Sequence, residues 1–241
     1  MAENDNDRLA VMIDADNAQA SLCPELLAEV ARFGVASVKR AYGDWTTTNL
    51  KGWKEHLHKH AIQPVQQFSY TTGKNATDSA LIIDAMDLLH EGKLDGFCLV
   101  SSDSDFTRLA TRIRELGLTV YGFGERKTPE PFVSACDKFI YTEILKNRTD
   151  VDEPQPVDAE QTSDLRDILI PAVNTVSKDD GWAPLSGVGD YLNKKYPSFD
   201  SRNYGYQKLG QLMKSLDYIS VDERRPQPGS PITHIFVQAT P

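Results

Sequence analysis

The chain has 241 residues, of which 40% are hydrophobic and 25% charged, and its formal net charge is −9 at pH 7. This composition is that of an ordinary globular protein and excludes a collagen-like or wholly disordered chain. The acidic balance excludes a protein that binds nucleic acid through a generally basic surface. The length leaves room for two compact domains.

The first residues, MAENDNDRLAVMIDADN, are acidic and amide-rich where a signal peptide needs a basic segment followed by a long apolar one. No apolar run approaches the length that spans a membrane. We therefore expect a cytoplasmic protein without membrane association. The cysteines, Cys23, Cys98 and Cys136, are odd in number and far apart, which predicts reduced thiols buried as small hydrophobic side chains.

Short β-rich runs alternate with amphipathic stretches from residue 9 to residue 141. The predicted strands are 9–13, 35–42, 62–68, 96–102, 118–124 and 138–141. The predicted helices are 24–33, 50–61, 76–90 and 106–116, with Leu50, Trp53 and Leu57 in the core. This alternation predicts an α/β fold with a doubly wound, mostly parallel sheet, whose ligands bind at the carboxyl ends of the strands.

A short acidic segment follows this region. Residues 149–160 contain five acidic residues, no basic ones, two prolines and no aromatic residue. Such a composition cannot bury a core and is typical of a mobile linker. We therefore expect one domain over residues 1–148 and a second over residues 161–241.

The second domain has the pattern of a small winged helix. Its predicted helices are 163–176, 186–196 and 201–216, and its predicted strands are 217–223 and 232–238, around a turn rich in proline and glycine. Ser163 and Asp200 precede helical segments and are suitable N-caps.

Carboxylates follow two of the predicted strands in the first domain. Asp14 ends the first strand in VMIDADN, and Ser102, Asp103 and Asp105 follow a later strand in CLVSSDSDF. Asp78 opens the long helix in KNATDSALIID. Because strand ends of this kind can be neighbours, we expect Asp14, Asp78 and Asp103 to bind Mg²⁺ or Mn²⁺ and to support hydrolysis of a phosphodiester.

Other polar residues near these positions have expected roles. Asn17 can orient a ligand or phosphate through its amide, and Lys74, one helical turn before Asp78, can neutralise the substrate. Asp105 is equally suited to cap the next helix. Asp84 lies six residues after Asp78 on a different face of the helix, so we expect it to be a structural or surface acid.

The segments IDADN, KNATDSALIIDAMDLL and LVSSDSDF resemble, in order, the motif series of NYN domains, relatives of the PIN nucleases, over about residues 8–146. The segments resemble those of the bacterial LabA-like branch in particular. The resemblance implies a PIN-like fold with metal ligands at Asp14, Asp78 and Asp103. It implies supporting roles for Asp105, Asn17, Ser102 and Lys74. The PIN pattern has a further acidic residue on an earlier helix, which has no clear counterpart here.

The segment FDSRNYGYQKLGQLMKSLDYISV resembles the OST-HTH (LOTUS) domain, and the resemblance covers about residues 162–238. It implies binding of RNA, including single-stranded or G-rich RNA, or of a protein partner. Cations and aromatic rings are combined in one short region, as a nucleic-acid surface requires. These residues are Arg202, Tyr204, Tyr206, Lys208 and Lys214, although the two tyrosines are as well suited to packing against the wing.

Two further motifs have competing interpretations. Asp14 and Asp16 form a D-x-D pair similar to that of haloacid-dehalogenase phosphatases, but Ala18 stands where that pattern has threonine or valine. The cluster HLHKH, with histidines 56, 58 and 60, has the residue type of a zinc site. Only the outer pair shares a helix face and no companion ligand is evident, so a solvated helix face is favoured.

Three hypotheses of function follow. The leading one is a metal-dependent endoribonuclease whose C-terminal module delivers the RNA through a flexible tether. The second is an RNA-binding regulatory or adaptor protein with a weak or inactive nuclease domain. Metal-dependent cleavage distinguishes the first hypothesis from the second. The third is a small-molecule phosphatase that uses Asp14 as its nucleophile.

Overall fold

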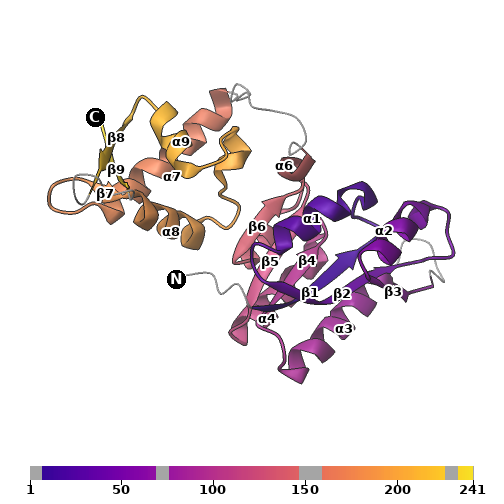
Figure 1. Cartoon of the computed structure of the whole chain (residues 1–241). Coiled ribbons are helices and arrows are strands. Elements are labelled where there is room, and N and C mark those ends of the chain that lie inside the picture. The colour runs from indigo at the N-terminus through magenta and orange to yellow at the C-terminus, as the bar shows by residue number, and fades with distance from the viewer. Residues whose placement is uncertain (1–6, 69–75, 147–158, 226–232, 241) are drawn as a thin grey trace. The chain divides into compact units, whose positions relative to one another are not determined.

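The computed structural model describes residues 7–68, 76–146, 159–225 and 233–240, without the side chains of residues 76 and 159–164. The chain divides into two compact units, Met1–Thr149 and Asp150–Pro241 (Figure 1). Most of the segment predicted as a linker, and Lys74, lie outside the described residues. Residues 159 and 160, which we assigned to that linker, already belong to a helix.

The N-terminal unit is built on a six-stranded sheet in which every neighbouring pair is parallel. The strands are β1 (Arg8–Asp14), β2 (Val35–Gly43), β3 (Gln63–Gln66), β4 (Gly96–Val100), β5 (Thr119–Gly124) and β6 (Lys138–Tyr141). Their order is β3-β2-β1-β4-β5-β6, so the direction of winding reverses between β1 and β4. In open parallel sheets the crevice at the carboxyl ends of such a pair is where ligands bind.

Helices cover both faces of this sheet (Figure 1). One face packs against α1 (Cys23–Val30), α2 (Trp53–Lys59) and α6 (Glu143–Lys146), and the other against α3 (Ala76–Glu91), α4 (Thr107–Glu115) and α5 (Glu130–Ala135). Leu50 and Trp53 are buried as expected, and Leu57 packs against the same core. The predicted doubly wound α/β fold is confirmed.

The two shortest helices, α5 and α6, were not predicted from the sequence. They have six and four residues, which is too few for a helical period of apolar positions to be recognised. The predicted strands and the other helices of this unit are all present, with ends that differ by a few residues because helix and strand ends are weakly encoded.

Asp84 has the structural role that its position predicts. Its carboxylate accepts hydrogen bonds from the Arg40 guanidinium and the Tyr42 hydroxyl, and so joins α3 to β2. Tyr42 is fully buried. Desolvation and the nearby Asp84 charge raise the pKa of the Tyr42 hydroxyl, which therefore stays protonated and donates.

Asp84→Ala is expected to lower the free energy of unfolding by about 2–4 kcal/mol, because it leaves the Arg40 guanidinium and the Tyr42 hydroxyl without their acceptor. Urea unfolding followed by circular dichroism measures this loss. Asp87→Ala is the matched control, since Asp87 is an exposed acid on the same helix, and should change stability by less than about 0.5 kcal/mol. Equal losses in the two variants would contradict the role of Asp84.

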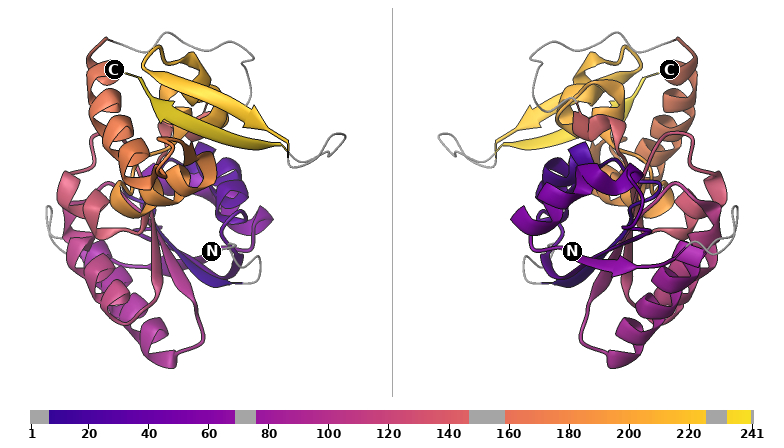
Figure 2. Two further views of the ribbon diagram at one scale, coloured as in Figure 1. Left: turned by 90° about the vertical axis from the view of Figure 1, so that its left-hand side faces the viewer. Right: turned by 90° about the vertical axis from the view of Figure 1, so that its right-hand side faces the viewer.

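The C-terminal unit combines helices with a three-stranded antiparallel sheet of order β7-β9-β8. Its elements are α7 (Ala159–Val176), β7 (Ala183–Pro184), α8 (Leu185–Lys195), α9 (Leu209–Ser215), β8 (Ile219–Arg224) and β9 (His234–Ala239). Figure 2 shows β8 and β9 as a long paired ribbon, in yellow. The turn between them lies outside the described residues.

The third predicted helix of this unit, residues 201–216, is wrong as a single element. A short 3-10 helix at Ser201–Tyr204 ends at Gly205, whose φ of +81° is left-handed, and α9 begins only at Leu209. Glycine adopts this conformation without steric cost, so it interrupts the helix. Asp200 is the predicted N-cap and accepts from the Arg202 amide at 2.9 Å. The prediction of Ser163 as an N-cap is wrong, because α7 already begins at Ala159.

Within the described residues, no helix combines the length and the apolar character needed to cross a membrane.

Candidate metal centre and nucleic-acid groove

Asp14 lies at the end of β1 and is fully buried. Its Oδ2 accepts hydrogen bonds from Asn17 Nδ2 at 2.7 Å and from Ser101 Oγ at 2.8 Å. Its Oδ1 is buried without a hydrogen-bond partner. A buried carboxylate oxygen without a donor is costly, so this atom is suited to contact a cation.

The loop that follows β4 supplies two more carboxylates beside β1. Asp103 caps the 3-10 helix at Ser104–Phe106, where its Oδ1 accepts from the Asp105 amide at 2.9 Å. The Asp103 amide donates to Ser101 Oγ at 3.1 Å. Ser101 therefore connects this loop to Asp14. The cap of this turn is Asp103, and not Asp105 as the sequence had allowed.

The third part of the site comes from the first turn of α3. Asp78 is 9% exposed, and one carboxylate oxygen each from Asp78, Asp103 and Asp105 lies within 4.8 Å of the others. The structure thus brings three of the four predicted acids together. The fourth, Asp14, is the largest source of negative charge acting on Asp78.

The negative charge on each of these carboxylates disfavours ionisation of its neighbours. Burial, and after it the nearby charges of Asp14, Asp103 and Asp105, together raise the pKa of Asp78 to about 6. Burial also raises the pKa of Asp14, against the opposing effect of its bonds to Asn17 and Ser101. A bound cation would offset the burial and mutual repulsion of these carboxylates. Sites built only of oxygen donors suit Mg²⁺ or Mn²⁺.

Two residues of this rim were not singled out from the sequence as part of a metal site. Asp16 accepts a hydrogen bond from Thr77 Oγ1 at 2.9 Å. Its negative charge contributes to the raised pKa of both Asp14 and Asp78. Ser101 bonds Asp14, as described above. The signal for Asp16 was present in the D-x-D pair, but nothing in the local sequence distinguishes Ser101 from the adjacent Ser102.

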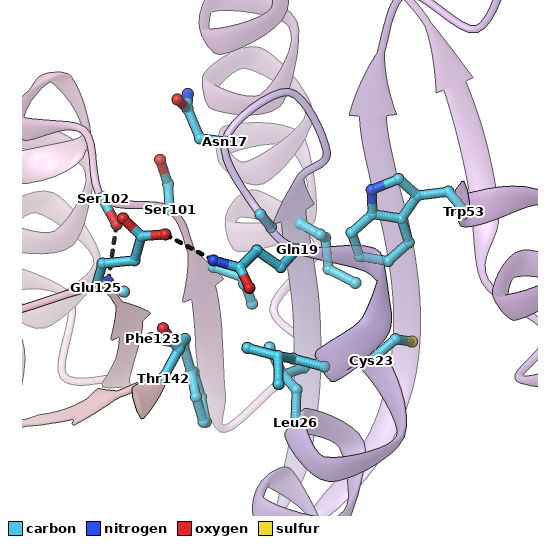
Figure 3. Close-up of a pocket in the computed structure, with 15 residues that line it drawn as sticks. Asn17, Gln19, Cys23, Leu26, Trp53, Ser101, Ser102, Phe123, Glu125 and Thr142 are labelled. Atoms are coloured by element: carbon cyan, nitrogen blue, oxygen red, sulfur yellow. Dashed lines mark hydrogen bonds between the residues drawn. The ribbon is translucent and has the colours of Figure 1, made fainter. Parts of the chain in front are cut away.

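Unlike that of Ser101, the Ser102 side chain bonds the residue that follows β5 and not Asp14. Its Oγ accepts from the Glu125 amide at 2.8 Å, and Glu125 in turn accepts from Gln19 Nε2 at 2.9 Å (Figure 3). These residues line a small pocket beside Asn17 and Ser101. Ser102 therefore positions Glu125, and its expected role beside the acids stays a prediction.

In the C-terminal unit several of the predicted RNA-binding residues are engaged within the fold. Arg202 is paired with Asp200 at 2.6 Å, with 13% of its side chain exposed. Tyr204 packs against Phe199 and, like Tyr206, against the core, which is the second of the two roles expected for these rings. Lys208 and Lys214 are the exposed members of the predicted set.

Lys208 lies on a groove with a largely apolar floor. The groove runs between α8, α9 and the start of β9, and Leu185, Leu209 and Ile235 contribute apolar side chains. Lys208 and Lys214 stand at its edge. Lys214 is paired with Glu223, so part of its charge is already neutralised.

Comparison with known families assigns both units. The model of the NYN domain matches residues 8–145, and so contains Asp14, Asp78, Asp103 and Asp105. The chain belongs to the NYN domain family. The model of the OST-HTH/LOTUS domain matches residues 159–230, which follow the NYN domain directly. The NYN domain suggests a nuclease, and the OST-HTH domain suggests RNA binding.

Solved structures give further likenesses. A protein of unknown function from Vibrio parahaemolyticus is 17% identical, over 58% of this chain and 94% of that one, with a TM-score of 0.48. An uncharacterized protein from Nitrosomonas europaea is 35% identical over 39% of this chain and 83% of that one, with a TM-score of 0.30. A protein from Chromobacterium violaceum is 41% identical over 31% and 78%, with a TM-score of 0.26. Among curated proteins, none matches.

Asp78→Asn is expected to raise the thermal stability of the metal-free NYN domain. Because the folded-state pKa of about 6 exceeds the ordinary value of 3.8, folding binds a proton, and stability falls as pH rises from about 4 to about 6. The variant lacks this penalty. We expect a gain of about 1–3 kcal/mol above pH 6, which disappears near pH 4.

Melting temperatures of both proteins in chelator, measured from pH 4 to pH 8, test this prediction. Asp87→Asn is the control, because this exposed acid lies on the same helix and outside the cluster. A gain for Asp78→Asn that does not depend on pH would show that the ionisation of Asp78 in the folded state is not its cause.

Proposed function

We propose that this protein is a metal-dependent endoribonuclease that hydrolyses RNA phosphodiester bonds. The observation that carries the proposal is the convergence of carboxylates at the crevice between β1 and β4, including one buried Asp14 oxygen without a partner. A cluster of this kind, in a member of a nuclease-related family, has the donors that a hard cation requires. NYN and PIN-like nucleases generally depend on divalent metals.

The cation would be held by Asp14, Asp78 and Asp103, with Asp105 at its open side, since Asp105 is the exposed member of the group. When bound, Mg²⁺ or Mn²⁺ supplies an activated water and neutralises the charge that develops on the phosphodiester. The protein's part is to hold the oxygens in place. Asn17 and Ser101 fix the Asp14 carboxylate through Oδ2, which leaves Oδ1 for the metal.

Two parts of the protein would bind the substrate, namely residues beside the acids and the OST-HTH domain. Asn17 lines the pocket of Figure 3 next to the acids, where its amide can also meet a phosphate oxygen. The role assigned to Lys74 in neutralising the substrate remains a prediction, because the residue lies outside the described set. The OST-HTH domain would bind the RNA and raise its local concentration at the NYN domain.

The test is cleavage of mixed single-stranded and structured RNAs by the purified chain, with Mn²⁺, with Mg²⁺ and with chelator. We expect internal cleavage that requires a metal and is absent from Asp103→Asn. RNA binding with no cleavage under any of these conditions would favour the alternative, a regulatory or adaptor protein with an inactive nuclease domain. The phosphatase alternative is disfavoured by the family assignment and by the full burial of Asp14, which keeps its carboxylate from a substrate phosphorus.

We further propose that the groove at Lys208 is the RNA-binding surface of the OST-HTH domain. In the cleavage-deficient Asp103→Asn background, Lys208→Ala is expected to weaken binding to single-stranded or G-rich RNA. The slope of log K against log salt should become shallower by roughly 0.7, the value for one phosphate contact on a single strand. Binding by fluorescence anisotropy at several salt concentrations measures both effects.

Lys178→Ala is the matched control, because Lys178 is exposed but does not line the groove. It should leave the salt slope unchanged. Arg202→Ala would be a poor probe, since it removes a largely buried ion pair with Asp200 and so destabilises the domain. An unchanged slope in Lys208→Ala would place the RNA surface elsewhere or favour a protein partner in the groove.

A further inference from the structure

A second cluster of metal-ligand side chains lies on the opposite side of the NYN domain core from α3. It is formed by Cys23, the first residue of α1, and by His56 and His60 at the end of α2. One ligand atom from each residue lies within 4.8 Å of the other two. We call these three residues the α1–α2 cluster.

Two nitrogens of this cluster, His56 Nδ1 and His60 Nε2, are buried without a hydrogen-bond partner, although imidazole nitrogens in that position normally find one. The two rings are stacked, with centroids 6.1 Å apart and planes inclined by 8°. Cys23 is a free thiol and 1% exposed. In Figure 3 its sulfur is directed away from Gln19 and Ser101.

We propose that the α1–α2 cluster is a zinc site, with Cys23 Sγ, His56 Nδ1 and His60 Nε2 as ligands. One thiolate and two imidazoles form a donor set that Zn²⁺ prefers, and binding would release the thiol proton to solvent. The fourth tetrahedral position is left to water or to Glu25. Its Oε2 is buried without a partner, and its charge acts on the Cys23 thiol.

The spacing fits such an ion with little movement. Zinc bonds of about 2.3 Å to sulfur and about 2.0–2.1 Å to nitrogen, arranged tetrahedrally, place ligand atoms roughly 3.5 Å apart. The cluster atoms lie within 4.8 Å, so they need to close by about 1 Å. Side-chain rotation at the end of a helix can supply a shift of this size.

The histidines alone do not predict this site, because the third ligand comes from a distant part of the chain. His56 and His60 are four residues apart and share a helix face, whereas His58 between them is exposed on another. Cys23 joins them because α1 and α2 pack on the same face of the sheet. The structure thus supplies a companion ligand, Cys23, that the local sequence does not show.

The site is chemically distinct from the acidic rim. Sulfur and imidazole donors select zinc over Mg²⁺, while the carboxylates at β1 and β4 suit the harder ions. Cys23 also lines the pocket that contains Asn17 and Ser101. A zinc ion here would fasten α1 to α2 and fix one wall of that pocket, without depending on nuclease activity.

The test is binding of Co²⁺ and Zn²⁺ to the full chain after removal of metals with a chelator, in excess Mg²⁺ to fill the acidic rim. We expect one equivalent of Co²⁺ to give a thiolate-to-cobalt charge-transfer band and intense tetrahedral d–d bands, both displaced by Zn²⁺. Cys23→Ser should lose the charge-transfer band. His60→Ala should weaken Zn²⁺ binding more than about 100-fold, beyond what loss of a residue that merely supports a ligand costs.

His58→Ala and the double variant Asp78→Asn/Asp103→Asn are the controls and should bind as the parent does. Circular dichroism of each variant shows whether it is folded, and His56→Ala replaces any variant that is not. Absence of the charge-transfer band in the parent, its survival in Cys23→Ser, or loss of binding only in the double aspartate variant would overturn the proposal. None of these outcomes bears on RNA cleavage, so the two proposals fail separately.

Discussion

Asp14→Asn should reduce metal-dependent RNA cleavage by at least about 10²–10³-fold, the cost of removing one preorganised electrostatic group from an active site. The substitution keeps the size of the side chain and an oxygen that can accept from Asn17 and Ser101. It removes the charge that the unpartnered Oδ1 would offer to the cation. Asp103→Asn should have a loss of similar size. Initial rates with a fluorescent RNA over a range of Mn²⁺ concentrations measure both.

The matched control for these variants is Asp87→Asn, which alters an exposed acid outside the cluster. Melting temperatures in chelator should show that Asp14→Asn and Asp103→Asn are at least as stable as the parent, since each relieves repulsion in an acidic group. If higher Mn²⁺ restores the rate, the loss lies in metal affinity; if it does not, the loss lies in the catalytic step. Cleavage by both variants at the parental rate would rule out the metal-site assignment.

Much of the candidate site follows from the order of buried strands in the sequence. The run LAVMI is apolar enough to be a central strand, and CLV is a second one, so the acids after each were expected at the same edge of the sheet. The structure pairs β1 with β4 and brings Asp78 to them from α3. This part was predictable because each carboxylate is fixed by the element that it ends or begins.

The remainder depends on side-chain directions and contacts between distant residues. Ser101 and Ser102 are adjacent and chemically identical, yet only the structure shows that the first bonds Asp14 and the second bonds Glu125. The sequence makes Arg202 a candidate RNA contact, and the structure shows that it is paired with Asp200. The meeting of Cys23 with His56 and His60 depends on helix packing, which no local pattern encodes.

Cutting the chain between its domains should lower kcat/KM on RNA by about 10²-fold or more, because a tether converts delivery of bound RNA into an intramolecular step. A protease site placed within residues 150–158 allows the cut to be made after folding. Each domain has a hydrophobic core of its own, so both should survive the cut. The loss should appear at low RNA concentration and fade near saturation, where kcat should match that of the intact chain.

The comparison is between the same protein preparation before and after the cut, so composition and metal content are identical. An RNA too short to occupy both domains is the control substrate, and its cleavage should not change. Lys208→Ala in the uncut chain should reproduce part of the loss, because it weakens the binding that the tether exploits. If the cut protein is as active as the intact one at every RNA concentration, the OST-HTH domain does not deliver substrate and acts independently of the nuclease domain.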